Sequence, residues 1–326
     1  MTKNYRISFL AWTVVLILLP FALYNEYARH LAVMSLIYAI MSQGLNLVLG
    51  YTGSLSLGQA ALYALGGYTS ALCMQYLNFN FWPALLAAVL IVALIGLLVG
   101  AVSLRVRGAA FIIMTITFSS IIHLILLNWV DLTNGQMGIA RIPGPSIFGF
   151  AIESKLAYYF FVLAFVIIVQ FICGRLINSR TGRAFIAVKE DESLAASLGI
   201  SPFHFSLLAF VIGSACTGLS GALYGSYIRF ISPEMGSFNL VMLPLLMMTV
   251  LGGRGTLWGP VLGAFIFTVL PEYLRIAEQL RMPIFGFLLI LMVLFIPNGL
   301  LPTFTSLIKK MRMKKQKNIQ EVAKND

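Results

Sequence analysis

Small neutral polar residues gather in one apolar stretch, residues 44–72, which reads GLNLVLGYTGSLSLGQAALYALGGYTSAL. The stretch contains no Asp, Glu, Lys or Arg, so it offers no carboxylate or cation for catalysis. Its amide and hydroxyl groups could instead offer hydrogen bonds to a polar solute without the free-energy cost of a buried charge. The candidates for lining such a path are Asn46, Gly53, Ser54, Ser56 and Gln59.

The same composition has a second explanation in helix packing. Gly and other small residues let two membrane helices approach closely. Clusters of Gly, Ser and Thr also tolerate a break in a helix, provided that the freed backbone groups face protein or a water-filled path. A solute path and close packing therefore both remain open from the residues alone.

Motifs for catalysis or nucleotide binding are missing from the sequence. It contains no G-x-x-x-x-G-K-[ST], no H-E-x-x-H, no G-x-S-x-G and no C-x-x-C pair. No Asp or Glu falls at the centre of an apolar run, which argues against an intramembrane hydrolase and against an autonomous ion-driven carrier. We therefore predict a non-catalytic chain with no catalytic residue, no cofactor and no metal site.

Two other residue types have chemical potential inside the apolar runs. Intramembrane polar residues are functional candidates by default, and His123 is such a residue, although we favour a hydrogen-bonded packing role for it. The isolated cysteines are expected to be packing residues without a disulfide. They are Cys73, Cys173 and Cys216.

The elements that carry these residues must lie in a membrane. The chain of 326 residues is 60% hydrophobic and 10% charged, whereas soluble domains carry about 25% charged residues. A helix needs about 20 residues to cross the hydrocarbon, and barrels show short alternating segments instead of long apolar runs. The fold class is therefore all-α and polytopic. The runs without Asp, Glu, Lys or Arg are 7–25, 31–104, 108–130, 156–174, 205–228, 235–253, 255–271 and 282–308.

The distribution of charge predicts the topology. Residues 31–104 have room for three spans with short connections, which gives about ten spans in all. With the N-terminus inside, this number places the larger share of the 22 Lys and Arg residues in cytoplasmic loops. We expect both termini in the cytoplasm, a transmembrane domain over 1–308 and a basic tail over 309–326 on anionic lipid. Nucleic acid is not an expected partner, because no aromatic pattern accompanies the basic residues.

A polar segment on the expected cytoplasmic side, residues 175–204, could dock a partner protein. Residues 184–200 predict one short helix with acidic residues in its first turns, where they complement the helix dipole. Gly199 should end this helix and Pro202 should prevent its continuation. A solvated loop helix without a partner is the alternative.

A weak internal sequence similarity suggests that the chain contains two related halves. Residues 53–62, GSLSLGQAAL, are similar to residues 253–262, GRGTLWGPVL. Pro83 and Pro283 are separated by the same number of residues as these two segments. Membrane transporters often contain repeated halves whose interrupted, short helices lie near the substrate path. Chance similarity between segments of low complexity is the other explanation.

Several ordered motifs in residues 31–302 resemble those of branched-chain amino acid ABC transporter permeases of the LivM type. The motifs are GLNLVLGYTGSLSLGQAALYALGGY, SLRVRGAAFIIMTITF, NWVDLTNGQMGIARIP, RTGRAFIAVKEDESLAASLGISPFHFSLLAFVIGSACTGLSGALYG, LGGRGTLWGPVLGAF and IPNGLL. The resemblance implies a permease subunit of the inner (plasma) membrane that imports a small polar solute, with branched-chain amino acids as the first candidate. It also implies a homologous permease partner, two cytoplasmic ATP-binding subunits and an extracytoplasmic solute-binding protein.

By the same resemblance, residues 175–204 correspond to the coupling loop that docks the ATP-binding subunits. Importer permeases often carry E-A-A-x-x-x-G there, but this chain has Ser193 at the Glu position and Glu192 one residue earlier. The departure affects the individual contacts of the docking helix but not its location. The residues on or beside the helix are Arg183, Glu190, Asp191, Glu192, Ala195, Ala196 and Gly199.

Three other functions compete with this interpretation. Related permeases serve urea, short amides or other amino acids. A self-sufficient facilitator would transport solute without any ATP-binding subunit, and the docking-like loop argues against it. A membrane enzyme would need a cluster of titratable residues at one membrane depth, and the sequence shows none.

Overall fold

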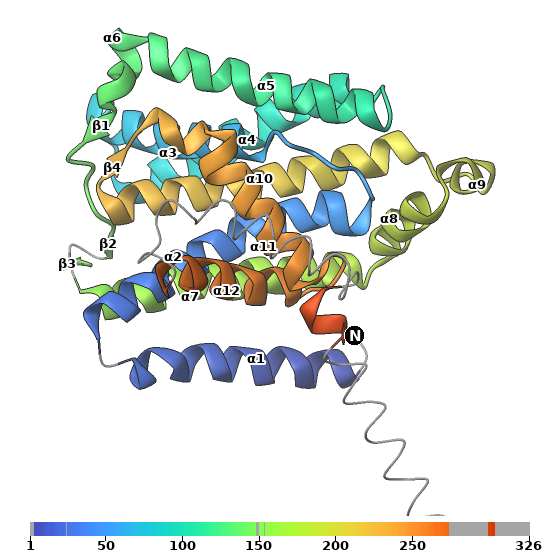
Figure 1. Cartoon of the computed structure of the whole chain (residues 1–326), viewed down its shortest axis with the longest axis horizontal. Coiled ribbons are helices and arrows are strands. Elements are labelled where there is room, and N and C mark those ends of the chain that lie inside the picture. The colour runs from blue at the N-terminus through green and yellow to red at the C-terminus, as the bar shows by residue number, and fades with distance from the viewer. Residues whose placement is uncertain (1–2, 24, 148–149, 153, 274–298, 304–326) are drawn as a thin grey trace, which may run out of the picture.

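Helices make up almost all of the computed structural model, which describes residues 3–23, 25–147, 150–152, 154–273 and 299–303. Figure 1 shows the long helices lying side by side as a bundle. The α-helices are α1 (Lys3–Ala22), α2 (Glu26–Leu45), α3 (Gln59–Tyr76), α4 (Phe81–Ser103), α5 (Ala109–Asn128), α6 (Val130–Thr133), α7 (Lys155–Ile177), α8 (Arg180–Glu190), α9 (Glu192–Ser197), α10 (Pro202–Ile228), α11 (Leu243–Gly253) and α12 (Gly259–Tyr273). The π-helices are η1 (Asn46–Tyr51) and η4 (Phe238–Met242), and the 3₁₀-helices are η2 (Gly135–Met137) and η3 (Pro233–Gly236).

Short strands add a small exception to the expected all-α class. Strand β1 (Ile139–Ala140) pairs antiparallel with β4 (Phe230–Ile231), and β2 (Ser146–Ile147) pairs antiparallel with β3 (Phe150–Ala151). These ribbons satisfy backbone hydrogen bonds where the chain between spans cannot form a helix. The β1–β4 pair ties the segment after α5 to the end of α10, at one end of the bundle (Figure 1).

Membrane-length helices identify a polytopic membrane protein. Five helices of the described chain are long and apolar enough to span, and three shorter apolar helices accompany them. The long ones are Glu26–Tyr51, Phe81–Ser103, Ala109–Asn128, Lys155–Ile177 and Pro202–Ile228, and the shorter ones are Phe9–Phe21, Phe238–Gly253 and Gly259–Leu270. The run 31–104, in which three spans were expected, holds parts or all of three α-helices, but only Glu26–Tyr51 and Phe81–Ser103 are candidate spans, and α3 is not among them. The last expected span, 282–308, lies mostly outside the described residues.

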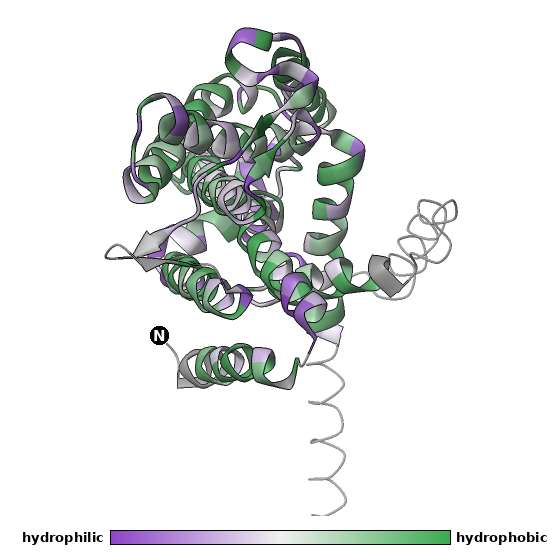
Figure 2. Ribbon diagram, turned by 90° about the vertical axis from the view of Figure 1, so that its left-hand side faces the viewer, coloured by the Kyte–Doolittle hydropathy of each residue, from purple (hydrophilic) through white to green (hydrophobic). Residues whose placement is uncertain are grey.

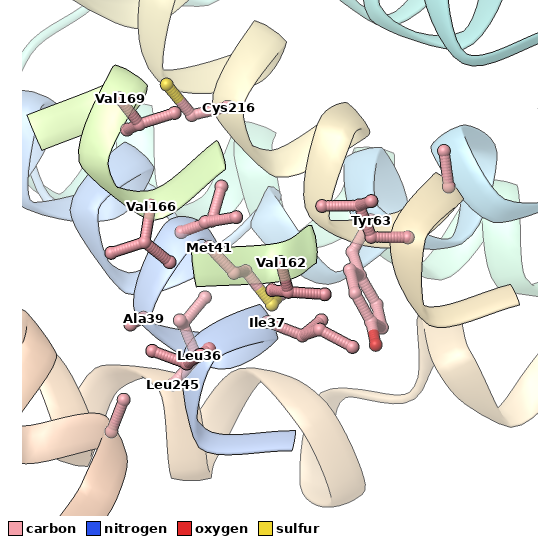
Figure 3. Close-up of a cluster of buried hydrophobic side chains, with 14 of the residues drawn as sticks. Leu36, Ile37, Ala39, Met41, Tyr63, Val162, Val166, Val169, Cys216 and Leu245 are labelled. Carbon is pink, nitrogen blue, oxygen red and sulfur yellow. The ribbon is translucent and has the colours of Figure 1, made fainter. Parts of the chain in front are cut away.

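Helix α2 lies at the centre of the packing, and its span is 89% buried. Figure 3 shows α2 side chains such as Ile37 and Met41 packed among Val162 of α7, Tyr63 of α3 and Leu245 of α11. The spans of α4 and α5 are only 28% and 22% buried. Their exposed apolar faces suit contact with lipid or with another membrane subunit. Figure 2 shows that hydrophobic residues, coloured green, predominate in most helices of the bundle.

Helix α3 shows why small and polar residues occur in the stretch 44–72. It packs against both α10 and α4, and most of its residues are buried. A Cβ atom added at Gly44 would lie 2.5 Å from the Gly213 carbonyl oxygen, and one added at Gly66 would overlap Gly218. These glycines therefore allow the backbones of α2 and α3 to contact α10 directly. A helix shielded in this way does not need the continuous apolar surface of a lipid-facing span.

Candidate functional site

The first candidate region is a break between α2 and α3. Helix α2 continues into η1, and the chain is then non-helical until Gln59 begins α3. Gly53 has φ +79°, a conformation that glycine adopts without steric cost. Two groups that follow the helix bond to the carbonyl of Val48: Thr52 Oγ1 at 2.7 Å and the Ser54 amide at 3.2 Å. The break is therefore an ordered helix end whose backbone groups find partners.

A second break separates α11 from α12 and touches the first. Gly253 and Gly255 have φ values of +126° and +75°. The side chain of Asn46 holds the two breaks together, since its Nδ2 donates to the Thr256 carbonyl at 2.8 Å and its Oδ1 accepts from the Gly255 amide at 2.8 Å. The helices that follow the two breaks begin at residues 59 and 259. Their starts are therefore separated by the same number of residues as the two similar segments, 53–62 and 253–262.

The five candidate path residues fall into two groups. Gly53 is exposed and Ser54 is half-buried, and both line a cavity. The other three are fully buried, with hydrogen bonds inside the chain. Besides the two bonds of Asn46, Ser56 Oγ accepts from the Gly58 amide at 3.3 Å and Gln59 Oε1 accepts from Thr217 Oγ1 at 2.7 Å. Of the five candidates, Gly53 and Ser54 are therefore the two that line this cavity.

The cavity has a volume of about 290 Å³ and lies between the first break and residues 175–204. Its walls combine neutral groups of the break with two cations, Arg107 and Lys189, and a run of acidic residues. The acidic residues are Glu190, Asp191 and Glu192. Such a mixed wall suits polar contact with water, solute or a partner protein more than it suits an apolar ligand.

The single helix expected over 184–200 is wrong, because the segment forms two helices, α8 and α9. Asp191 separates them with extended backbone, at φ −158° and ψ 111°. Its carboxylate accepts hydrogen bonds from the Ser193 hydroxyl at 2.6 Å and from the Ser193 and Leu194 amides at 2.8 and 3.0 Å. An N-cap residue needs non-helical backbone, so the cap of α9 interrupts the helix before it. The same bonds, that from the Ser193 hydroxyl first, lower the pKa of Asp191.

Other features of this segment agree with the sequence. Gly199 has φ +80° and ends α9, and Pro202 begins α10. Glu192 forms an ion pair with Arg107, with 2.9 Å between Oε2 and Nε. Ala195 is buried, while Arg183, Glu190 and Ala196 are exposed. In Figure 1, α8 and α9 project from the end of the bundle opposite the strands.

Some residues of interest were not singled out in the sequence. Lys189 donates from Nζ to the Gly50 carbonyl oxygen at 2.9 Å, although its only signal is a position beside the acidic run. Thr217 donates a hydrogen bond to Gln59, and its only signal in the sequence is a hydroxyl group inside an apolar run.

His123 Nδ1 lies 3.0 Å from the Pro233 carbonyl oxygen, which supports the expected hydrogen-bonded packing role. The three cysteines lie in α3, α7 and α10.

Comparison with known proteins adds the family. A family model described as branched-chain amino acid transport system / permease component matches residues 27–296. The chain belongs to this family. This membership confirms the resemblance of the sequence motifs and the expectation of a non-catalytic ABC transporter permease subunit.

Individual relatives support the same family. The chain is 33% identical to the high-affinity branched-chain amino acid transport system permease protein LivM of Escherichia coli, over 92% of this chain and 76% of the relative. It is 28% identical to the corresponding LivH protein of the same organism, over 81% of this chain and 91% of that protein. A probable LivM of Methanocaldococcus jannaschii is 24% identical over 85% of this chain and 94% of its own length. No solved structure matches the chain.

Proposed function

We propose that this permease imports branched-chain amino acids across the inner (plasma) membrane. The observation that carries the proposal is the family match over residues 27–296, which spans nearly all of the described helical bundle. The helix break contributes neutral hydrogen-bonding groups to a cavity whose other walls carry both cations and carboxylates, and this mixed lining is consistent with passage of a zwitterionic solute.

The proposed topology has about ten spans with both termini in the cytoplasm. Two observations support it: the positive-inside distribution of Lys and Arg, and the placement of the strands and of α8–α9 at opposite ends of the bundle (Figure 1). The transmembrane domain then covers 1–308, with residues 175–204 in the cytoplasm. The basic segment 309–326 would form a cytoplasmic tail.

The proposed solute path passes the first helix break. Gly53 and Ser54 face the cavity and would contact solute or its water. Asn46, Ser56 and Gln59 are buried and bonded within the chain, so they would shape the path by holding the break in place. This division refines the five candidates into two contact residues and three supporting residues.

The proposed energy source is ATP hydrolysis in two partner subunits that dock on residues 175–204. The exposed side chains of Arg183, Glu190 and Ala196 are available to such a partner, and Asp191, Glu192, Ala195 and Gly199 maintain the shape of α9 and its connections. A homologous permease and an extracytoplasmic solute-binding protein would complete the assembly. Closure of the ATP-binding subunits would then move α8–α9 and reorient the helix bundle.

Variants of the docking segment test the assignment. We expect the charge reversals Glu190→Lys and Glu192→Lys, and Gly199→Leu, to lower ATP-driven uptake at least about tenfold, a loss within the usual range of coupling energies. Membrane insertion should remain intact, because these residues lie outside the spans. Uptake equal to that of the wild type in all three variants would contradict the docking assignment.

The partner assignment is tested by purification from native membranes. The tagged chain is solubilised gently, and the co-purifying proteins are identified by mass spectrometry. We expect two ATP-binding subunits, a related permease and a solute-binding protein whose ligand can then be screened. Recovery of the chain alone would favour a self-sufficient facilitator, and a binding protein for urea or amides would change the solute.

A further inference from the structure

Lys189 connects the α8–α9 segment to both helix breaks. Its Nζ donates to the carbonyl oxygen of Gly50 at 2.9 Å. The same ammonium group lies beside the second break, since a Cβ atom added at Gly255 would be 3.5 Å from Lys189 Nζ. Gly255 in turn donates its amide to Asn46, which stands at the start of η1. One side chain from α8 thus contacts the point at which the two breaks meet.

The chemistry of a helix end explains why a lysine suits this position. Gly50 lies in the last turn of the continuous helix Glu26–Tyr51, where carbonyl groups lack intrahelical partners. A cation near the C-terminal end of a helix also complements the negative end of its dipole. Since Gly50 has no side chain, Asn46 and Gly255 can approach it closely on one side while its carbonyl oxygen accepts from Lys189.

We propose that Lys189 is a positioning residue that transmits movement of α8 to the helix breaks during transport. This inference rests on the proposed function, because it assigns the residue through which docked ATP-binding subunits act on the membrane bundle. An ion pair of the same segment, between Glu192 and Arg107, reaches the loop between α4 and α5 and has side-chain exposures of 36% and 72%. Lys189 is also exposed, but it differs from this pair because its ammonium group bonds to a carbonyl oxygen of the first break.

The test compares Lys189→Met with a matched control in the complete transporter. Methionine retains an unbranched side chain but removes the ammonium donor. The control is Arg105→Met, which removes a cation that lies just after α4 and donates to the Ala101 carbonyl in the last turn of that helix at 3.2 Å. Uptake and ATP hydrolysis are measured in the same proteoliposomes. We expect Lys189→Met to lower the number of solute molecules moved per ATP about tenfold, with hydrolysis retained and with the control equal to wild type.

Two further substitutions make the result decisive. Lys189→Arg should keep wild-type coupling, because the guanidinium can still donate to the Gly50 carbonyl. Lys189→Gln should lose coupling, because its shorter side chain falls short of that oxygen. A ratio of uptake to hydrolysis that is unchanged in Lys189→Met or Lys189→Gln would overturn the inference. Failure of both variants to assemble with the ATP-binding subunits would also overturn it, since Lys189 would then serve docking.

The wild-type protein separates this inference from the proposed function. If wild-type uptake needs no ATP, the proposed function itself fails, whatever the variants do. If wild-type uptake is ATP-driven and Lys189→Met couples normally, only the role of Lys189 fails.

Discussion

At the scale of single residues, Asn46 connects parts of the chain that are about 200 residues apart. Its amide bonds to both Gly255 and Thr256, and each of these bonds is 2.8 Å long. The sequence marked Asn46 as a polar group in an apolar run, but it could not show whether solute or protein would satisfy the amide. Partners so distant in sequence depend on the packing of α2 against α11 and α12, which no local pattern encodes.

Replacing Asn46 by Leu should destabilise the folded protein. The change leaves the Gly255 amide and the Thr256 carbonyl without their partner, and because both residues are half-buried each loss should cost about 1 kcal/mol, the lower end of the range for unsatisfied groups. Thermal unfolding in detergent measures the effect. The control, Asn128→Leu, removes an exposed amide that bonds only within α5, to the Leu124 carbonyl, and should leave the melting temperature unchanged. Equal melting temperatures for both variants would contradict the role of Asn46.

Gly66→Ala should be destabilising for a steric reason. Its Cβ atom would overlap the backbone of Gly218, so α3 and α10 must separate. Overpacking of this kind costs about 1–3 kcal/mol. Ala110→Val, on an exposed position of α5, adds bulk without a buried neighbour and serves as the control. Both are compared by thermal unfolding, and a Gly66→Ala protein as stable as the wild type would show that α3 and α10 do not pack as described.

At the scale of elements, the α8–α9 segment shows what a local pattern can and cannot predict. Gly199 ended α9 as its backbone preference predicts, and Pro202, which was expected only to prevent continuation, begins α10. The interruption at Asp191 was missed because three adjacent acidic residues looked like the first turn of one helix. Its decisive signal was the capping pattern of Asp followed by Glu and Ser, which competes with helix continuation.

The cap at Asp191 predicts a pH dependence of α9. The folded-state pKa of Asp191 is lowered, so the carboxylate stabilises α9 above the ordinary pKa of Asp. This contribution is lost as the pH falls through the lowered, folded-state pKa. At neutral pH, Asp191→Ala should accelerate hydrogen exchange at the Ser193 and Leu194 amides several-fold.

Asp191→Asn provides the matched control for this pH effect. Asparagine also caps helices well, so exchange at both amides should stay slow at neutral pH. Because its amide does not titrate, α9 should lose the acid-induced weakening that is expected for the carboxylate. Unchanged exchange in Asp191→Ala would show that the cap does not hold α9.

At the scale of the whole molecule, composition and apolar runs were enough to predict a polytopic helical protein. The run 31–104 holds three α-helices, but α3 is not among the candidate spans, so the length of an apolar run does not by itself give the number of spans. The sequence did not show that α3 is shielded by α4 and α10, because its glycines could serve either a path or close packing. The arrangement of helices decides between these uses, and it depends on contacts between segments far apart in the chain.

Uptake by reconstituted protein tests the central claim most directly. Proteoliposomes contain either the complete transporter or this chain alone, with ATP sealed inside or omitted and with loaded solute-binding protein outside. We expect branched-chain amino acids to accumulate only in vesicles that contain the complete transporter and ATP. Equilibration of the amino acid by this chain alone, at the same rate with and without ATP, would contradict an ATP-driven permease.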